Sequence, residues 1–238
     1  MPKIKALESI ADLSEEVQEA ILSIPLSDKY FIAFSGGLDS IALVYFCLPY
    51  LKIHAKNIQV IHVNHGLSPN ALAWANFCKA FCLELGIECN VIDVDVNSEG
   101  DGLEAAARKA RYSVFDHYLL DGGVILQGHH LNDQAETVLM RVIKGLGPEA
   151  IKGIPKTRTL SKGVLFRPWL GLPREILESE MKNFGLSWVE DESNQDIRFE
   201  RNYLRKIVLP LLKKRRPTIF YDLERAAKKA QDTSEFIQ

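Results

Sequence analysis

The sequence predicts an α/β fold: a doubly wound, Rossmann-like parallel sheet with a small C-terminal helical extension. Two observations support this prediction. Strand-length apolar runs alternate with helix-length segments, and polar signatures follow three of the four predicted strands. Because crossovers between parallel strands are right-handed and ligands bind at the carboxyl ends of such strands, the chemistry is expected along one edge of the sheet.

The predicted elements occur in a regular order along the chain. Four apolar runs have strand length: Tyr30 to Phe34, Ile58 to Val63, Cys89 to Val94 and Gly123 to Gln127. Helix-length segments lie between them, at 40–51, 70–85 and 103–120. A further helix is expected from about Asn132 to Lys144, with Gly145 ending it in a left-handed conformation. Beyond it, helices are expected at 173–183, 201–212 and 221–238.

Composition is that of an ordinary globular protein, with 238 residues, 47% hydrophobic and 25% charged. The net charge of −2 conceals an asymmetry. Residues 1–140 carry 9 Lys and Arg against 18 Asp and Glu, whereas residues 141–238 carry 20 against 13, which gives −9 and +7. A basic second half can attract a polyanion such as nucleic acid, although solvated helix faces would explain the same charge.

Other protein classes are disfavoured by what the sequence lacks. No segment approaches the roughly 18 to 20 apolar residues of a membrane span, and the N-terminus has no signal-peptide plan. We therefore expect a cytoplasmic protein with no membrane partner. The four cysteines, Cys47, Cys78, Cys82 and Cys89, form no CxxC pair and are interpreted as reduced, packed thiols.

Residues 35–40 read Ser-Gly-Gly-Leu-Asp-Ser, directly between the first predicted strand and the first predicted helix. Gly36 and Gly37 allow successive backbone N–H groups to surround an anion, and the helix that starts near Ser40 adds its positive end. Asp39 and the phosphates are both negatively charged, so their proximity is favourable if Mg²⁺ lies between them. The segment therefore predicts a phosphate cradle with Asp39 as magnesium ligand; a plain strand-to-helix turn is the alternative.

Five ordered segments resemble a known family. They are SGGLDS, HVNHGL (62–67), LEAAARKARY (103–112), GHHLNDQAET (128–137) and EDESNQDIRFERNYLR (190–205). The first is similar to the loop of N-type ATP pyrophosphatases, the PP-loop superfamily, which cleave ATP between the α and β phosphates. The whole set resembles the tRNA(Ile)-lysidine synthetase family from about residue 28 to about residue 212.

The resemblance implies a fold, a reaction and its substrates. The fold would be adenine nucleotide alpha hydrolase-like. The family joins free L-lysine to carbon 2 of the wobble cytidine in a CAU-anticodon tRNA(Ile), through an adenylated cytidine, with release of AMP and pyrophosphate. ATP and Mg²⁺ are the implied cofactors. The implied organisation is a catalytic core at 1–145, its basic completion at 146–212, and a helical linker at 213–238 towards further domains.

The implied ATP-binding residues are those of the loop: Ser35, Gly36, Gly37, Leu38, Asp39 and Ser40. Attack on the α-phosphate builds negative charge, so a cation must be aimed there. Arg108 is expected to be the catalytic arginine, with Arg111, three residues further along the same helix face, as the second candidate.

The segment GHHLND is expected to face the same edge of the sheet. Asp133 is expected to provide a second metal contact, or to orient the lysine ammonium and accept its proton. Asn132 is expected to cap the helix, although the family usually has two consecutive aspartates here. His129 is the preferred histidine for contact with phosphate or base. Asn64 or His65 is expected to meet adenosine or the target base.

The basic half carries the expected RNA contacts. Arg201 and Arg205 share a helix face and are expected to bind tRNA phosphates, while pairing with the acidic stretch at 190–192 is the alternative. The tryptophans Trp74, Trp169 and Trp188 are interpreted as core residues, with base stacking the nearest alternative for Trp169.

Two other functions stay open at this point. One is another tRNA-modifying enzyme with the same loop, such as a thiolase, although its iron–sulfur branch needs CxxC ligands. The other is a non-catalytic adenine-nucleotide-binding module, which needs neither metal nor polyanion contacts. The sequence also leaves open a homodimer, the lysine-binding residues and the discrimination of the tRNA body. Longer family members carry C-terminal RNA-binding domains, so a catalytic core is expected here.

Overall fold

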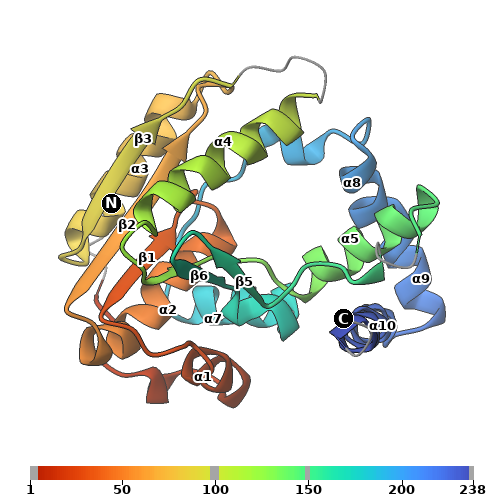
Figure 1. Ribbon diagram of the computed structural model, residues 1–238, viewed down its shortest axis with the longest axis horizontal. Coiled ribbons are helices and arrows are strands. Elements are labelled where there is room, and N and C mark those ends of the chain that lie inside the picture. Colours follow the sequence, from red (N-terminus) through yellow and green to blue (C-terminus); the bar gives the residue numbers. More distant parts are fainter. Residues whose placement is uncertain (1–4, 97–101, 148–150, 236–238) are drawn as a thin grey trace.

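The computed structural model describes residues 5–96, 102–147 and 151–235. The α-helices are α1 (Glu15–Leu22), α2 (Leu38–His54), α3 (Ala71–Glu84), α4 (Leu103–Tyr118), α5 (Leu131–Ile143), α7 (Arg174–Asn183), α8 (Glu200–Tyr203), α9 (Leu209–Arg215) and α10 (Ile219–Glu235). The strands are β1 (Lys29–Ala33), β2 (Asn57–Asn64), β3 (Glu88–Asp93), β4 (Val124–Leu126), β5 (Thr157–Leu160) and β6 (Gly163–Phe166). Their arrangement is shown in Figure 1.

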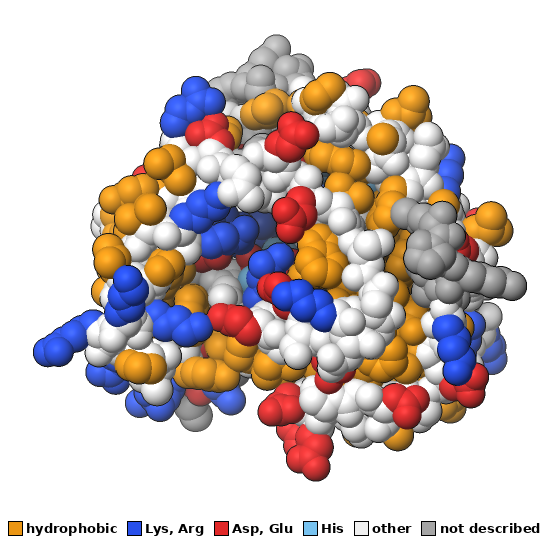
Figure 2. All heavy atoms as spheres, turned by 180° about the vertical axis from the view of Figure 1, so that it is seen from behind, with side chains coloured by type: hydrophobic (Ala, Val, Ile, Leu, Met, Phe, Trp, Pro, Cys, Tyr) orange, Lys and Arg blue, Asp and Glu red, His pale blue; other side chains and the backbone are white. Residues whose placement is uncertain are grey.

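The strands form one sheet in the order β3-β2-β1-β4-β6-β5, parallel except for β5 at the edge. From β1 the chain builds outwards through β2 and β3, and then returns through α4 to place β4 on the other side of β1. The strand order therefore reverses between β1 and β4, which is where such sheets bind ligands. Charged side chains of both signs line a hollow in this part of the molecule (Figure 2).

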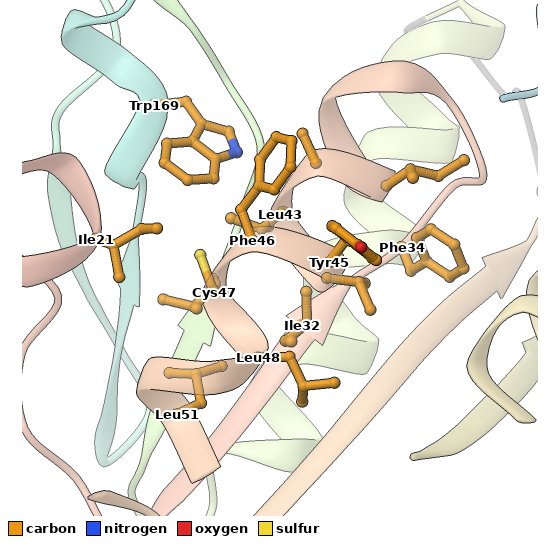
Figure 3. Packing of buried hydrophobic residues seen from close by; sticks show 14 of the residues in the cluster. Ile21, Ile32, Phe34, Leu43, Tyr45, Phe46, Cys47, Leu48, Leu51 and Trp169 are labelled. Atoms are coloured by element: carbon orange, nitrogen blue, oxygen red, sulfur yellow. The ribbon is translucent and has the colours of Figure 1, made fainter. Parts of the chain in front are cut away.

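Two apolar layers cover the sheet, so the predicted doubly wound fold is confirmed. Tyr30 and Ile32 of β1 point into the larger core, which also contains α1, α2, α3 and α7 (Figure 3). Phe31, between them in the strand, points into the second core, where Phe115 of α4 packs. This alternation follows from the two-residue period of a β-strand.

Helix α2 fixes the position of the SGGLDS loop. Its residues are buried from the first turn almost to the end, among them Leu43, Phe46, Cys47 and Leu51 (Figure 3). A helix that is apolar on all sides is held by its neighbours on all sides. The loop at its N-terminus is consequently anchored between a central strand and a fully packed helix.

The sequence predicted neither α1 nor the hairpin in the C-terminal half. The hairpin β5–β6 extends the sheet beyond β4, with Ser161 in its turn at φ 51°. The predicted basic helix is α8, a π-helical turn (Leu204–Val208) and α9 in succession. Helix α10 packs along α5 (Figure 1). None of the helices in the described parts of the chain has the length and apolar character that a membrane crossing requires.

The end of α5 is as predicted. Gly145 has φ 65°, and the N–H groups of Gly145 and Leu146 donate to the carbonyl oxygens of Val142 (3.0 Å) and Arg141 (3.2 Å). These bonds satisfy carbonyls that the last helical turn leaves unpaired, and glycine adopts the required conformation without a Cβ clash.

Candidate active site

The SGGLDS loop is held in shape by its own hydroxyl groups. The Ser35 N–H donates to Ser40 Oγ (3.1 Å), and that hydroxyl donates to the Gly37 carbonyl (2.9 Å). Gly36 has φ 81°, and its carbonyl accepts from Val189 N–H (2.9 Å). The first two N–H groups of α2, those of Leu38 and Asp39, have no backbone acceptor in the described structure, whereas those of Ser40 and Ile41 donate to the Gly37 carbonyl. The loop can therefore present backbone donors and the positive end of a helix to an anion.

The GHHLND segment packs directly against this loop, as the strand order requires. A Cβ on Gly128 would lie 2.9 Å from the carbonyl oxygen of Asp39, closer than real Cβ contacts allow. Only glycine permits this approach of two backbones. The ends of β1 and β4 are thereby joined at the switch point of the sheet.

His130, rather than His129, reaches Asp39. Its Nδ1 accepts from Asp133 N–H (3.3 Å), while Asp133 Oδ2 accepts from His130 N–H (3.1 Å), which is a capping box at the start of α5. The other ring nitrogen, Nε2, consequently lies 3.6 Å from Asp39 Oδ1 and 3.5 Å from Asp133 Oδ2. The expectation that His129 contacts phosphate or base stays a prediction.

Asp39 has the environment of a cation ligand. Its Oδ1 is buried and accepts no hydrogen bond from the described residues, with Arg174 Nε at 3.7 Å. Burial raises the pKa of the Asp39 carboxyl, and the neighbouring Asp133 charge adds to this, against the opposing charges of His130 and Arg174. A buried anion without a donor is costly unless a cation joins it.

These features fit Mg²⁺. That ion binds through one or two carboxylates, with nucleotide phosphates and water completing its octahedron. Across residues 5–96, 102–147 and 151–235, no group of three or more His, Cys, Asp or Glu side chains is arranged to hold a metal. Asp39 would therefore hold the ion together with the nucleotide, rather than as part of a protein cage.

Four charged side chains form a network beside the loop. Arg201 Nε donates to Glu136 Oε2 (2.8 Å) and its Nη2 to Asp133 Oδ1 (2.7 Å). Arg205 Nε donates to Glu136 Oε1 (2.6 Å), and its Nη2 lies 3.4 Å from Asp133 Oδ1. The two arginines share a face, as expected. Their partners, however, are carboxylates of α5 rather than the acidic stretch at 190–192. Their assignment to tRNA phosphates stays a prediction.

Asn132 does not cap α5, which corrects the prediction, because His130 and Asp133 form the capping box there. Asp133 caps α5, whereas Asn132 Oδ1 accepts from the N–H of Arg174, the first residue of α7 (3.1 Å). Burial alone would raise the pKa of Asp133, but the charges of His130 and Arg201 and a backbone hydrogen bond hold it below its usual range. Asp133 is thus a persistent anion and a weak proton acceptor.

His129 belongs to a different cluster. Its Nδ1 accepts from Arg167 Nε (3.1 Å), and burial together with the Arg167 and Arg201 charges lowers its pKa to about 3, although Asp133 opposes this. His129 is therefore neutral, with its proton on Nε2. Arg108 is exposed and donates to Tyr112 Oη (3.3 Å).

The cavity at this edge has a volume of about 650 Å³ and is lined by the ends of β1, β2 and β4 and by parts of 188–195 and 205–206. Arg111 lines it and Arg108 does not, whereas the catalytic assignment of either arginine stays a prediction. Trp169 is fully buried, which confirms it as a core residue. Trp188 packs against the same core from a half-buried position and also lines the cavity, as does Trp74.

His65 also lines this cavity, where β2 ends. Neither of its ring nitrogens has a hydrogen-bond partner among the described residues. Burial and the Arg111 charge lower its pKa to about 4. A neutral imidazole carries one donor and one acceptor, so His65 is available to hydrogen-bond a bound base.

Sequence reasoning missed three residues of the site: His130, Glu136 and Arg174. The first two stand inside the quoted GHHLNDQAET segment, three residues before and three residues after Asp133, so that each lies about one helical turn from it near the start of α5. That spacing was the available signal. Arg174 had no comparable signal, because its approach to Asp39 depends on the contact between α7 and Asn132.

A cavity at the switch point of a parallel sheet, lined by a loop of this kind, is the arrangement of an ATP-binding α/β domain. Residues 10–212 match the model of the PP-loop domain, and the chain belongs to this family of ATP-binding domains. It is 38% identical over 214 residues to a tRNA(Ile)-lysidine synthase of Coxiella burnetii. The aligned residues make up 90% of this chain and 48% of that protein. It is 42% identical over 199 residues to the tRNA(Ile)-lysidine synthase of Pseudomonas putida, covering 83% and 46%.

The chain thus spans about half the length of the curated relatives it matches. Among solved structures, a U34-tRNA thiolase from Methanococcus maripaludis superimposes with a TM-score of 0.74 at 18% identity, over 92% of this chain and 78% of that one. At this level of identity, the similarity establishes a shared fold.

Proposed function

We propose that this chain ligates lysine to carbon 2 of the wobble cytidine in a CAU-anticodon tRNA(Ile), through an adenylated cytidine and with release of AMP and pyrophosphate. The observation that carries the proposal is the meeting of SGGLDS and GHHLND at the switch point, with His130 between Asp39 and Asp133. The similarity to lysidine synthases over most of the chain supplies the substrate class. The cytoplasm is the proposed location.

In the first half-reaction, the loop binds the ATP phosphates. The hydroxyls of Ser35 and Ser40 fix the turn, and the N–H groups at the start of α2 donate to phosphate oxygens. Mg²⁺ held by Asp39 would neutralise charge on the leaving pyrophosphate. Arg111, which lines the cavity, is the better placed arginine for the α-phosphate, where negative charge develops.

In the second half-reaction, Asp133 acts through its negative charge and not as a base. The lysine amine attacks only as the neutral form, so a proton must leave it. The pKa of Asp133 is held low and that of His129 lies near 3, so neither is a strong base. We therefore assign to Asp133 the orientation of the lysine ammonium before attack, and to His129 a neutral contact with base or phosphate.

ATP–pyrophosphate exchange tests the activation step. The chain is incubated with ATP, Mg²⁺ and labelled pyrophosphate, with or without an isoleucine tRNA transcript bearing CAU. A transcript with UAU is the matched control, because its wobble base is uridine, which has a carbonyl at position 4 and an N–H at N3 where cytidine has an amino group and an acceptor nitrogen. We expect exchange only with CAU. Exchange with both transcripts would contradict cytidine adenylation, and ATP binding without any exchange would favour a nucleotide-binding module.

A further inference from the structure

Arg167 is a buried cation without an anionic partner. Its side chain lies after β6, and the residue is 1% exposed. Its three donor groups bond to neutral acceptors: His129 Nδ1 (3.1 Å), the Pro155 carbonyl (2.7 Å) and Tyr112 Oη (3.0 Å). No carboxylate pairs with it in the described parts of the chain. Burying a charge in this way is costly unless an anion lies nearby.

Two more guanidinium groups gather on the same tyrosine. Arg108, on α4, lies 5.0 Å from the ring centroid of Tyr112 and also donates to its hydroxyl. Arg158, on β5, lies 4.9 Å from the same centroid. Both are exposed, and neither pairs with an Asp or Glu among the residues that the structure describes. Three positive charges thus surround one ring, and they repel one another at these distances.

This cluster differs from the other arginines near the active site. Arg201 and Arg205 are neutralised by Asp133 and Glu136, and Arg174 lies 3.7 Å from Asp39. In the cluster around Tyr112, by contrast, Arg108 and Arg158 keep guanidinium donors facing solvent, and neither has a carboxylate partner among the described residues. A planar guanidinium group can donate two parallel hydrogen bonds to phosphate oxygens, and stacking on an aromatic ring fixes its orientation before the phosphate binds.

The basic surface continues along the hairpin. Lys156, two residues before Arg158, lies over the Phe166 ring at 5.4 Å. Burial and the positive charge of Lys228, on α10, lower its pKa. A strip of positive charge therefore runs from α4 over the hairpin towards α10, rather than forming an isolated point.

We propose that the exposed Arg108 and Arg158, stacked on Tyr112, form a binding site for a backbone phosphate of the RNA substrate, next to the nucleotide that enters the cavity, while the buried Arg167 holds the Tyr112 hydroxyl and adds positive charge. The hydrogen bond from Arg167 to His129, which lines the cavity, connects the two sites. ATP phosphates belong to the SGGLDS loop, so the phosphate held here is a phosphodiester of the polynucleotide. The inference rests on the proposed tRNA substrate. It assigns Arg108 to RNA binding instead of to the α-phosphate of ATP.

Arg158→Gln tests the site, because this side chain is exposed and its strand pairs through the backbone. Arg215→Gln is the matched control: it removes one exposed arginine at the end of α9 that has no ion pair in the described structure. Affinity for a CAU anticodon stem-loop RNA is measured by fluorescence anisotropy over a range of salt concentrations. The affinity for ATP is measured alongside.

We expect Arg158→Gln to weaken RNA binding about five- to tenfold more than the control and to lower the salt slope by about 1, with ATP affinity unchanged. Arg158→Lys should recover part of the loss, because it keeps charge without the planar fork. Equal affinities for Arg158→Gln and the control would overturn the site. So would calorimetry in which inorganic phosphate binds through Arg158 while RNA affinity is unaffected. A wild-type chain that binds the RNA but transfers no lysine would instead refute the proposed function and leave this site standing.

Discussion

The ion network beneath the loop makes a quantitative prediction for Glu136→Gln. Glu136 is 1% exposed in its side chain and accepts from both arginines, at 2.8 Å from Arg201 and 2.6 Å from Arg205. Removing one partner of a buried pair costs about 3 to 5 kcal/mol. The arginine side chains are 29% and 39% exposed, so water compensates part of the loss and about 3 kcal/mol is the better figure.

The expected consequence is a measurable drop in the melting temperature. For a domain of this size, 1 kcal/mol corresponds to roughly 2 to 4 °C, so Glu136→Gln should melt roughly 6 to 12 °C below wild type. Circular dichroism at pH 7 measures this difference. Asp28→Asn is the control, because its pair with Lys56 is solvent-exposed and should change the midpoint by less than about 2 °C. A Glu136→Gln midpoint as close to wild type as the control would refute the reasoning.

Three further predictions follow from the loop and its neighbours. Asp39→Asn should abolish pyrophosphate exchange yet raise the melting temperature of the ligand-free chain. The pKa of Asp39 is raised in the folded chain, so ionisation of Asp39 destabilises the fold once the pH rises above the unfolded value near 3.8. The higher melting temperature of Asp39→Asn should therefore be seen at pH 7 and be absent at pH 3. A melting temperature equal to wild type at pH 7 would contradict this. Gly128→Ala should weaken ATP binding by at least about tenfold in calorimetry, because its Cβ forces the two backbones apart, whereas Gly171→Ala, with open space around its Cβ, should be silent. Arg111→Gln should slow exchange by about 100-fold, and Arg108→Gln by much less; the opposite order would restore the assignment made from the sequence.

The sequence was sufficient wherever local pattern determines structure. Alternating apolar strands and helices specified four of the parallel strands and the edge of the sheet that carries the site. Gly145 identified the end of α5, because a left-handed residue is needed there. SGGLDS identified the loop, since its glycines and its position between strand and helix have few other uses.

The contacts that the sequence did not predict join residues that are distant along the chain. Asn132 caps α7, 42 residues away, and Arg205 pairs with Glu136 across 69 residues, so neither contact leaves a trace in local spacing. The edge strand β5 is short and largely exposed, without the apolar alternation that predicts a strand. Net charge does not reveal such pairing for a related reason: Arg201 and Arg205 count as basic in the sequence, although carboxylates of the acidic half pair with them.

Lysine transfer to tRNA tests the central proposal most directly. The chain is incubated with labelled lysine, ATP, Mg²⁺ and the CAU isoleucine tRNA transcript, and the label is located by nuclease digestion. The account predicts ATP-dependent lysine at the wobble cytidine and nowhere else, with loss of incorporation in Asp39→Asn. A chain that binds ATP and this tRNA but leaves the cytidine unmodified would contradict it.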